Sequence, residues 1–238
     1  MPTTTSTSRC SGGRRFALAV IVWAMTSAAV QAQVAPSASE AAAYSSLHAA
    51  AWKGDVAAIE KGAANKAALE ARERNGRTPL HVATFAKRSE AVRALMKAGA
   101  NHAALDNDRY DAVTIAAVAD DENTLRVLLT EGASAKLTTS RYDGTALIAA
   151  AHLGHDGVVR QLIAAGAPLD HVNNLHWTAA IEAVVLGDGG PRHQATLKAL
   201  IDAGANTKLA DREGRTPLQL ARTRGYATMV KLLETAPR

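Results

Sequence analysis

A pattern that repeats about every 33 residues constrains this chain more than any other feature of its sequence. A side chain that can accept a hydrogen bond from the first free amides of a helix recurs at intervals of 33, 33, 34, 33 and 38 residues, at Ser45, Thr78, Asp111, Thr145, Thr178 and Thr216. Alanine follows five residues later in every case, at Ala50, Ala83, Ala116, Ala150, Ala183 and Ala221. A side chain this small lets helices approach closely. We therefore expect six repeat units, each beginning with a helix.

Each unit also contains the pattern of a second helix. Apolar residues recur at i, i+3 and i+4, which places them on one face, at Val92/Leu95/Met96, Leu125/Leu128/Leu129, Val159/Leu162/Ile163, Leu197/Leu200/Ile201 and Met229/Leu232/Leu233. Glycine ends four of these segments, at Gly99, Gly132, Gly166 and Gly204, where a left-handed cap is favoured. Two short helices with one apolar face cannot fold alone but can stack, so the pattern predicts an all-α solenoid of helix-turn-helix units.

Two stretches carry a more specific signature. Gly76–Ala83 reads Gly-Arg-Thr-Pro-Leu-His-Val-Ala, and Gly214–Leu218 reads Gly-Arg-Thr-Pro-Leu. With Ala98-Gly99-Ala100-Asn101, they resemble the signature of the ankyrin-repeat family. The resemblance covers residues 45–238 and implies an ankyrin-repeat domain of about six stacked units, with finger-like hairpin loops and a concave groove formed by the fingers and the first helices.

The N-terminal residues have the order of a secretory signal peptide. Arg9, Arg14 and Arg15 precede a continuous apolar run at residues 16–25, and small residues follow. Ten apolar residues reach only about 15 Å in a helix, about half of the hydrocarbon thickness of a bilayer. We therefore interpret residues 1–32 as a signal peptide cleaved after Ala32, which leaves no membrane span. Residues 33–44, rich in Ala, Ser and Pro, are predicted to be a flexible lead-in.

Removal of this leader changes the charge balance. The chain has 27 basic and 22 acidic residues. Residues 1–32 contain three of the basic and none of the acidic ones, so 24 against 22 would remain, a net charge of +2. The basic excess that would favour nucleic-acid binding is thereby mostly lost. The single cysteine, Cys10, leaves with the leader, which suits an oxidising compartment. The expected location is the periplasm, with secretion from the cell as the alternative.

The sequence gives little support to catalysis. The mature chain would contain no thiol, and no serine lies in a Gly-x-Ser-x-Gly motif. We predict neither catalytic residues nor a cofactor, and no metal site is assigned. The fifth unit carries about four extra residues within Leu186–His193, and a metal or small-ligand site formed there by His176, Asp188 and His193 is the alternative hypothesis.

Aromatic residues favour partner binding instead. In ankyrin-like proteins, finger tips and the ends of the first helices contact partners. Five aromatic residues map to these positions: Trp52, Phe85, Tyr110, Tyr142 and Trp177. Large rings at a surface are typical of interaction hot spots. Four arginines also map to fingers and could form a polar rim: Arg77, Arg109, Arg141 and Arg215.

The sequence thus predicts a non-enzymatic protein–protein interaction module that is exported and binds a protein through its concave face. A secreted effector that acts on host proteins is the further alternative. The sequence specifies neither the partner nor the oligomeric state.

Overall fold

The computed structural model describes residues 34–236, which belong to a compact unit spanning residues 33–238. The predicted signal peptide and Cys10 lie outside the described residues. Within the described part of the chain, no helix has the length and apolar character needed to cross a membrane.

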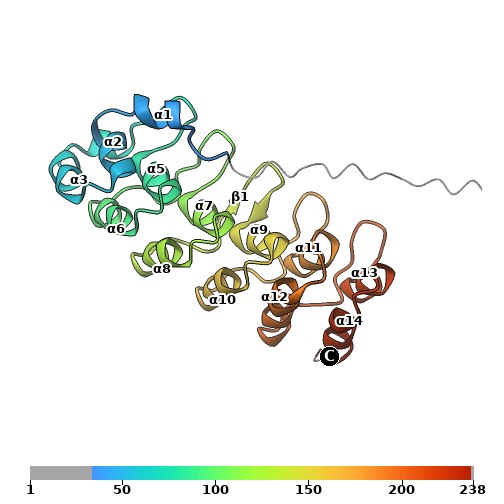
Figure 1. Cartoon of the computed structure of the whole chain (residues 1–238). Helices are drawn as coiled ribbons and strands as arrows, with labels where there is room; N and C mark the ends of the chain where they lie inside the picture. The colour runs from blue at the N-terminus through green and yellow to red at the C-terminus, as the bar shows by residue number, and fades with distance from the viewer. Residues whose placement is uncertain (1–33, 237–238) are drawn as a thin grey trace, which may run out of the picture. The chain divides into compact units, whose positions relative to one another are not determined.

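Six helix pairs form two layers along the repeat domain (Figure 1). The inner layer, next to the long loops, consists of the first helix of each unit: α2 (Ser46–Lys53), α5 (Pro79–Phe85), α7 (Ala112–Val118), α9 (Ala146–Leu153), α11 (Ala179–Val185) and α13 (Pro217–Arg224). The outer layer consists of the second helices: α3 (Val56–Gly62), α6 (Ser89–Lys97), α8 (Glu122–Thr130), α10 (Asp156–Ala164), α12 (Pro191–Asp202) and α14 (Ala227–Glu234). A further short helix, α4 (Lys66–Leu69), follows α3. The prediction of an all-α repeat solenoid is confirmed.

Five of the six predicted caps explain where the inner helices begin, whereas Ser45 forms no side-chain capping hydrogen bond at the start of α2. Asp111, Thr145, Thr178 and Thr216 each accept a hydrogen bond from the amide three residues ahead. Thr78 instead pairs with His81, whose Nδ1 lies 3.1 Å from the Thr78 amide nitrogen. Each contact satisfies backbone donors that the first helical turn leaves free.

The core runs continuously through all six units and is mostly aliphatic. The six alanines at the fifth position of each inner helix are all buried, which lets adjacent helices pack closely. The outer helices contribute leucines from the predicted stripes, including Leu95, Leu128 and Leu162, all fully buried. Leucine and alanine, rather than aromatic rings, therefore fill the interior.

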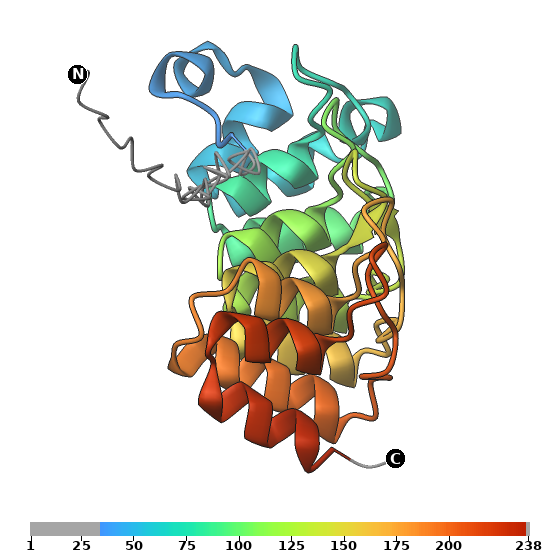
Figure 2. The same cartoon turned by 90° about the vertical axis from the view of Figure 1, so that its right-hand side faces the viewer.

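Five long loops connect successive units on the side of the inner helices, and Figure 2 shows them as one row along the stack. We call them fingers: residues 71–77, 104–110, 138–144, 171–177 and 209–215. The third finger and the residue that follows it contain the antiparallel pair β1 (Thr138–Thr139) and β2 (Gly144–Thr145), in which Thr138 pairs with Thr145. This pair is the only regular β-structure between residues 34 and 236.

Part of the lead-in is helical. Residues Ala38–Ala43 form helix α1, which begins with a capping box between Ser37 and Glu40. Glu40 also accepts a hydrogen bond of 2.9 Å from Asn75 in the first finger. Composition suggested mobility because Ala, Ser and Pro are common in linkers, but this particular spacing of Ser and Glu caps a helix.

Candidate protein-binding face

The fingers and the inner helices together form what we call the finger face. The residue five positions before each cap accepts hydrogen bonds from backbone amides and thereby closes the finger turn. Asp106, for example, accepts bonds from the amides of Asp108 and Tyr110 at 3.0 and 2.9 Å. The equivalent residues are Glu73, Ser140, Asn173 and Asp211.

A second regularity fixes the finger tips. The residue two positions before each cap has a positive φ between 52° and 75°: Gly76, Arg109, Asp143, His176 and Gly214. Left-handed backbone reverses the chain within the finger and suits glycine best. Sequence analysis missed both regularities, although the recurring Asp, Asn, Glu or Ser at the fifth position before each cap is visible in the sequence.

Hydrogen bonds also run from finger to finger. The Asn107 amide donates to the Asn75 carbonyl at 3.0 Å, and the Asn174 amide donates to the Tyr142 carbonyl at 3.0 Å. The Ser140 amide donates to the Arg109 carbonyl at 2.8 Å. The first four fingers are therefore joined by their backbones, and the fifth is joined to the fourth by the Arg212 side chain, which donates to the Asn174 carbonyl at 3.0 Å.

The histidines of the inner helices serve this surface. His48 Nε2 lies 3.0 Å from the Arg77 carbonyl oxygen, and His81 Nε2 lies 3.1 Å from that of Tyr110. His81 is 1% exposed, and burial lowers its pKa from 6.5 to about 4, so the neutral ring is the stable form near pH 7.

The five predicted aromatic anchors are all partly buried. Tyr110 and Tyr142 lie on fingers, and burial raises the pKa of Tyr110. Trp177 lies at the end of the fourth finger and packs against the core, as does Trp52 at the end of α2. Trp52 also packs edge-on against Tyr44, with ring centroids 6.1 Å apart. The predicted set therefore divides into a central group on the fingers and a group near the N-terminal end.

The predicted arginine rim needs correction at Arg77, which is 4% exposed. Its guanidinium lies 4.7 Å from the centre of the Phe85 ring and donates a hydrogen bond to the Val34 carbonyl. Spacing alone placed Arg77 on a finger, but the lead-in covers it.

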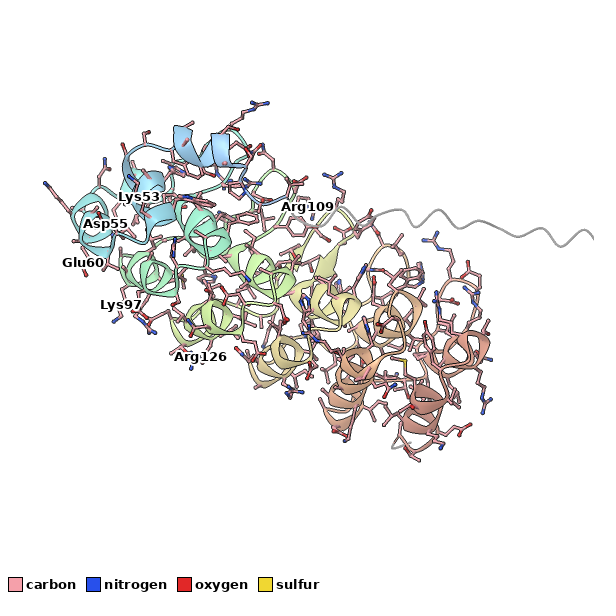
Figure 3. All side chains as sticks on the ribbon, in the orientation of Figure 1. Lys53, Asp55, Glu60, Lys97, Arg109 and Arg126 are labelled. Carbon is pink, nitrogen blue, oxygen red and sulfur yellow. The ribbon has the colours of Figure 1, made fainter. Side chains whose placement is uncertain are left out.

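The other three arginines are exposed and paired. Arg109 lies 3.2 Å from Asp143 and Arg141 lies 2.5 Å from Asp108, so the two pairs brace neighbouring fingers. Arg215 contacts Asp211 at 2.7 Å within its own finger, and this contact lowers the pKa of the Asp211 carboxyl. Figure 3 shows Arg109 on the finger side of the domain, whereas Lys97 and Arg126 project from the outer helices.

The insertion of the fifth unit has a structural role. Asp188 Oδ1 lies 2.8 Å from His193 Nδ1, while His193 Nε2 lies 2.9 Å from the His152 carbonyl oxygen. Tyr226 donates to the Gly187 carbonyl at 3.0 Å, and Arg192 contacts Asp120 at 2.7 Å. The insertion thus connects units three to six.

A metal site at this insertion finds no support. Among the described residues, no group of three or more His, Cys, Asp or Glu side chains is arranged to hold a metal ion. The exposed His176 lies on the fourth finger and does not complete the pair formed by Asp188 and His193.

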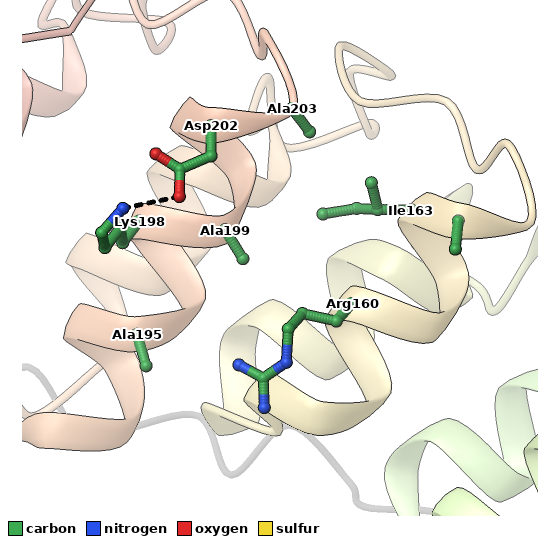
Figure 4. A pocket seen from close by; sticks show the side chains of 8 residues that line it. Arg160, Ile163, Ala195, Lys198, Ala199, Asp202 and Ala203 are labelled. Atoms are coloured by element: carbon green, nitrogen blue, oxygen red, sulfur yellow. Dashed lines mark hydrogen bonds and ion pairs between the residues drawn. The ribbon is translucent and has the colours of Figure 1, made fainter.

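A cavity of about 410 Å³ lies between the outer helices α10 and α12 (Figure 4). Its lining includes Ile163 and several alanines, with the ion pair of Lys198 and Asp202 at one side, 2.6 Å apart. The charged side chains of this lining, Arg160, Lys198 and Asp202, are largely exposed, and Lys198 and Asp202 are held in their mutual ion pair.

The exposed apolar residues of the repeats lie away from the cavity between α10 and α12. The large hydrophobic residues of the repeats that are more than a third exposed are Leu153, Val172, Leu175 and Leu186, at 37–43%. Val172 and Leu175 lie on the fourth finger, and Leu153 and Leu186 lie at the ends of the inner helices α9 and α11. Sequence analysis considered aromatic rings only and missed all four. For Leu153 and Leu186 the available signal is leucine at the eighth position after the cap.

Comparison with known proteins establishes the family. The family described as ankyrin repeats (3 copies) matches residues 47–139, 114–211 and 147–236. This chain belongs to the ankyrin-repeat family.

Similarity to individual ankyrin-repeat proteins supports the same family. The chain is 32% identical over 188 residues to an Escherichia coli K12 protein named as the ankyrin repeat protein YahD, covering 79% of this chain and 93% of YahD. A solved ankyrin repeat domain from Acinetobacter baumannii AYE is 46% identical, with a TM-score of 0.75, over 80% of this chain and 96% of that domain. The solved ankyrin repeat protein EF0377 is 29% identical, also with a TM-score of 0.75, over 82% of this chain and 100% of that protein. The ankyrin fold is a scaffold for protein–protein interaction and is typically non-enzymatic.

Proposed function

We propose that this ankyrin-repeat protein is a non-enzymatic binding module, exported to the periplasm, that recognises a protein partner through the finger face. The observation that carries the proposal is the distribution of exposed apolar side chains. All four of the strongly exposed large hydrophobic residues within the repeats lie on the fourth finger or at the ends of α9 and α11.

All four belong to the fourth and fifth units, and a local excess of exposed apolar side chains is typical of interaction surfaces. Trp177 and Tyr142 lie on the fourth and third fingers, and rings of this size bury much area at little cost in side-chain entropy. The fingers are held by hydrogen bonds before any partner arrives, so binding requires little ordering of the backbone.

Affinity capture with the chain from residue 33 tests the proposal. A partner captured from a periplasmic extract is expected to lose at least about tenfold in affinity after Trp177→Ala with Tyr142→Ala, or after Leu175→Gln. Lys97→Gln with Arg126→Gln, on the outer helices, is the matched control and is expected to leave affinity unchanged. Unaltered binding by the folded finger-face variants would exclude this face.

Export requires a separate test, because the support for the signal peptide is the residue pattern of positions 1–32 and not the binding face. Mass spectrometry of the protein recovered from its native host is expected to show an N-terminus at Gln33, in a periplasmic fraction. Recovery of the intact chain from the cytosol would contradict the proposed location while leaving the binding face untouched.

A further inference from the structure

The N-terminal end of the finger face is covered by the chain's own lead-in. Residues 34–43 lie against the first finger and cover Arg77, which is 4% exposed although its position belongs to a finger. Two predicted anchors, Trp52 and Phe85, lie beside this covered region through their contacts with Tyr44 and Arg77.

The covered guanidinium is incompletely satisfied. One Nη of Arg77 donates to the Val34 carbonyl, and the plane lies over Phe85. Its Nε and other Nη are buried and have no hydrogen-bond partner of good geometry among the described residues, although the buried Tyr44 hydroxyl lies near the guanidinium. Burying donors without partners is unfavourable. In the covered arrangement, these Arg77 donors therefore remain free to bind an acceptor.

The cover itself is weakly held. Helix α1 contains no buried residue, and in this segment only Pro36 is buried. Its polar attachment consists of the Val34 contact to Arg77 and the hydrogen bond of 2.9 Å between Asn75 and Glu40. A short helix with so little apolar contact can open without unfolding the repeats.

We propose that the surface under residues 34–43, centred on Arg77 and Phe85, binds a carboxylate side chain of the protein partner, which displaces the lead-in. The proposal rests on the proposed function, because it names the chemistry that one end of the finger face recognises.

The donor arrangement favours a carboxylate. A single carbonyl oxygen satisfies one guanidinium donor, whereas a carboxylate accepts two parallel hydrogen bonds from Nε and Nη. Phe85 supports the guanidinium from one side and excludes water there. Of the neighbouring carboxylates, Glu73 and Asp106 accept hydrogen bonds from backbone amides of their own fingers, and Glu40 moves away with the lead-in.

The test uses nuclear magnetic resonance titration of the chain from residue 33. The probe is the peptide acetyl-Gly-Glu-Gly-amide, and its twin with Gln in place of Glu is the neutral control. The observed signals are the Arg77 Nε–Hε resonance and the backbone amide resonances of residues 77 and 85, which remain observable when Arg77 is replaced. Ser37→Ala with Glu40→Ala removes the capping box and the contact to Asn75, and is expected to strengthen binding of the Glu peptide at least about fivefold, because the open state becomes more populated.

Matched variants control for indirect effects. Thr216→Ala with Gln219→Ala removes the equivalent capping box at the far end of the repeats and is expected to leave peptide binding unchanged. Arg77→Lys keeps the charge but not the paired donors and is expected to abolish saturable binding. Equal binding of the Glu and Gln peptides, or no binding to the folded opened variant, would overturn the proposal.

The two proposals fail in different ways. If a captured partner depends on Leu175 and Trp177 but is indifferent to Arg77→Lys and to opening of the lead-in, this inference is wrong and the proposed function stands. If the Glu peptide binds at Arg77 as expected while the finger-face variants leave partner capture unchanged, the proposed binding face is wrong and the carboxylate site stands.

Discussion

His81 combines a cap, a cross-unit contact and burial in one side chain. Its Nδ1 bonds to Thr78 at the start of α5, and its Nε2 contacts the carbonyls of Ala104 and Tyr110 at 3.0 and 3.1 Å. Burial lowers its pKa to about 4, while the unfolded chain protonates near 6.5.

The unfolded state therefore binds the proton first as pH falls. His81 stabilises the fold fully above about pH 6.5, and this contribution is lost progressively down to about pH 4, by about 3 kcal/mol in total. Urea denaturation at pH 7 and pH 4.5 measures the effect. His81→Gln keeps a capping partner, as Gln219 does in the last unit, and is expected to show a much smaller loss between the two pH values. Equal pH dependence of both proteins would contradict the assignment.

Backbone strain at a finger tip can be measured in isolation. His176 is exposed and has a φ of 63°, which an L-residue other than glycine adopts at a cost. His176→Gly is expected to increase the free energy of unfolding by roughly 0.5–1 kcal/mol, in a thermal or urea melt. The reverse change, Gly214→Ala at the equivalent position, is expected to decrease it by a similar amount, since a Cβ there meets no atom within 4 Å. A decrease on His176→Gly would show that the imidazole makes a stabilising contact.

Among the elements, the insertion before α12 shows how a loop that lengthens one unit becomes part of the packing. Gly189 has a φ of 72°, and a Cβ there would lie 2.5 Å from the Tyr226 ring. The Tyr226 hydroxyl bonds to the Gly187 carbonyl, so the loop is held against the last unit.

Two glycine substitutions separate strain from packing. Gly225 has the same φ of 72° but open space around its Cβ position. Gly225→Ala is expected to cost about 1 kcal/mol from strain alone, and Gly189→Ala a further 1–3 kcal/mol from overpacking, roughly. Equal destabilisation in chemical denaturation would mean that the insertion is loosely attached.

Across the whole molecule, stability is expected to be uneven, because each unit packs mainly against its neighbours. The first unit has a short outer helix, α3, in which only Ile59 is buried, whereas α8 buries four residues, including Leu125 and Leu128. Amide hydrogen exchange is expected to be at least about tenfold faster in α3 than in α8. Uniform exchange over both helices would indicate that the six units unfold as one cooperative block.

Local chemistry made much of this architecture predictable from the amino-acid sequence. Caps such as Thr178, the recurring alanines and the apolar stripes act within a few residues, so they reveal the helices, their order and the stacking. The 33-residue period then identifies the family, and the finger positions of Tyr110 and Tyr142 follow from it.

Only the tertiary structure decided which finger residues remain available. The Arg77 guanidinium donates to the Val34 carbonyl, 43 residues earlier, and Arg192 contacts Asp120, 72 residues away. The exposed leucines at the ends of α9 and α11 are exposed because no neighbouring unit covers them. Such contacts depend on where distant segments meet in space, and neither helical periodicity nor capping spacing contains that information.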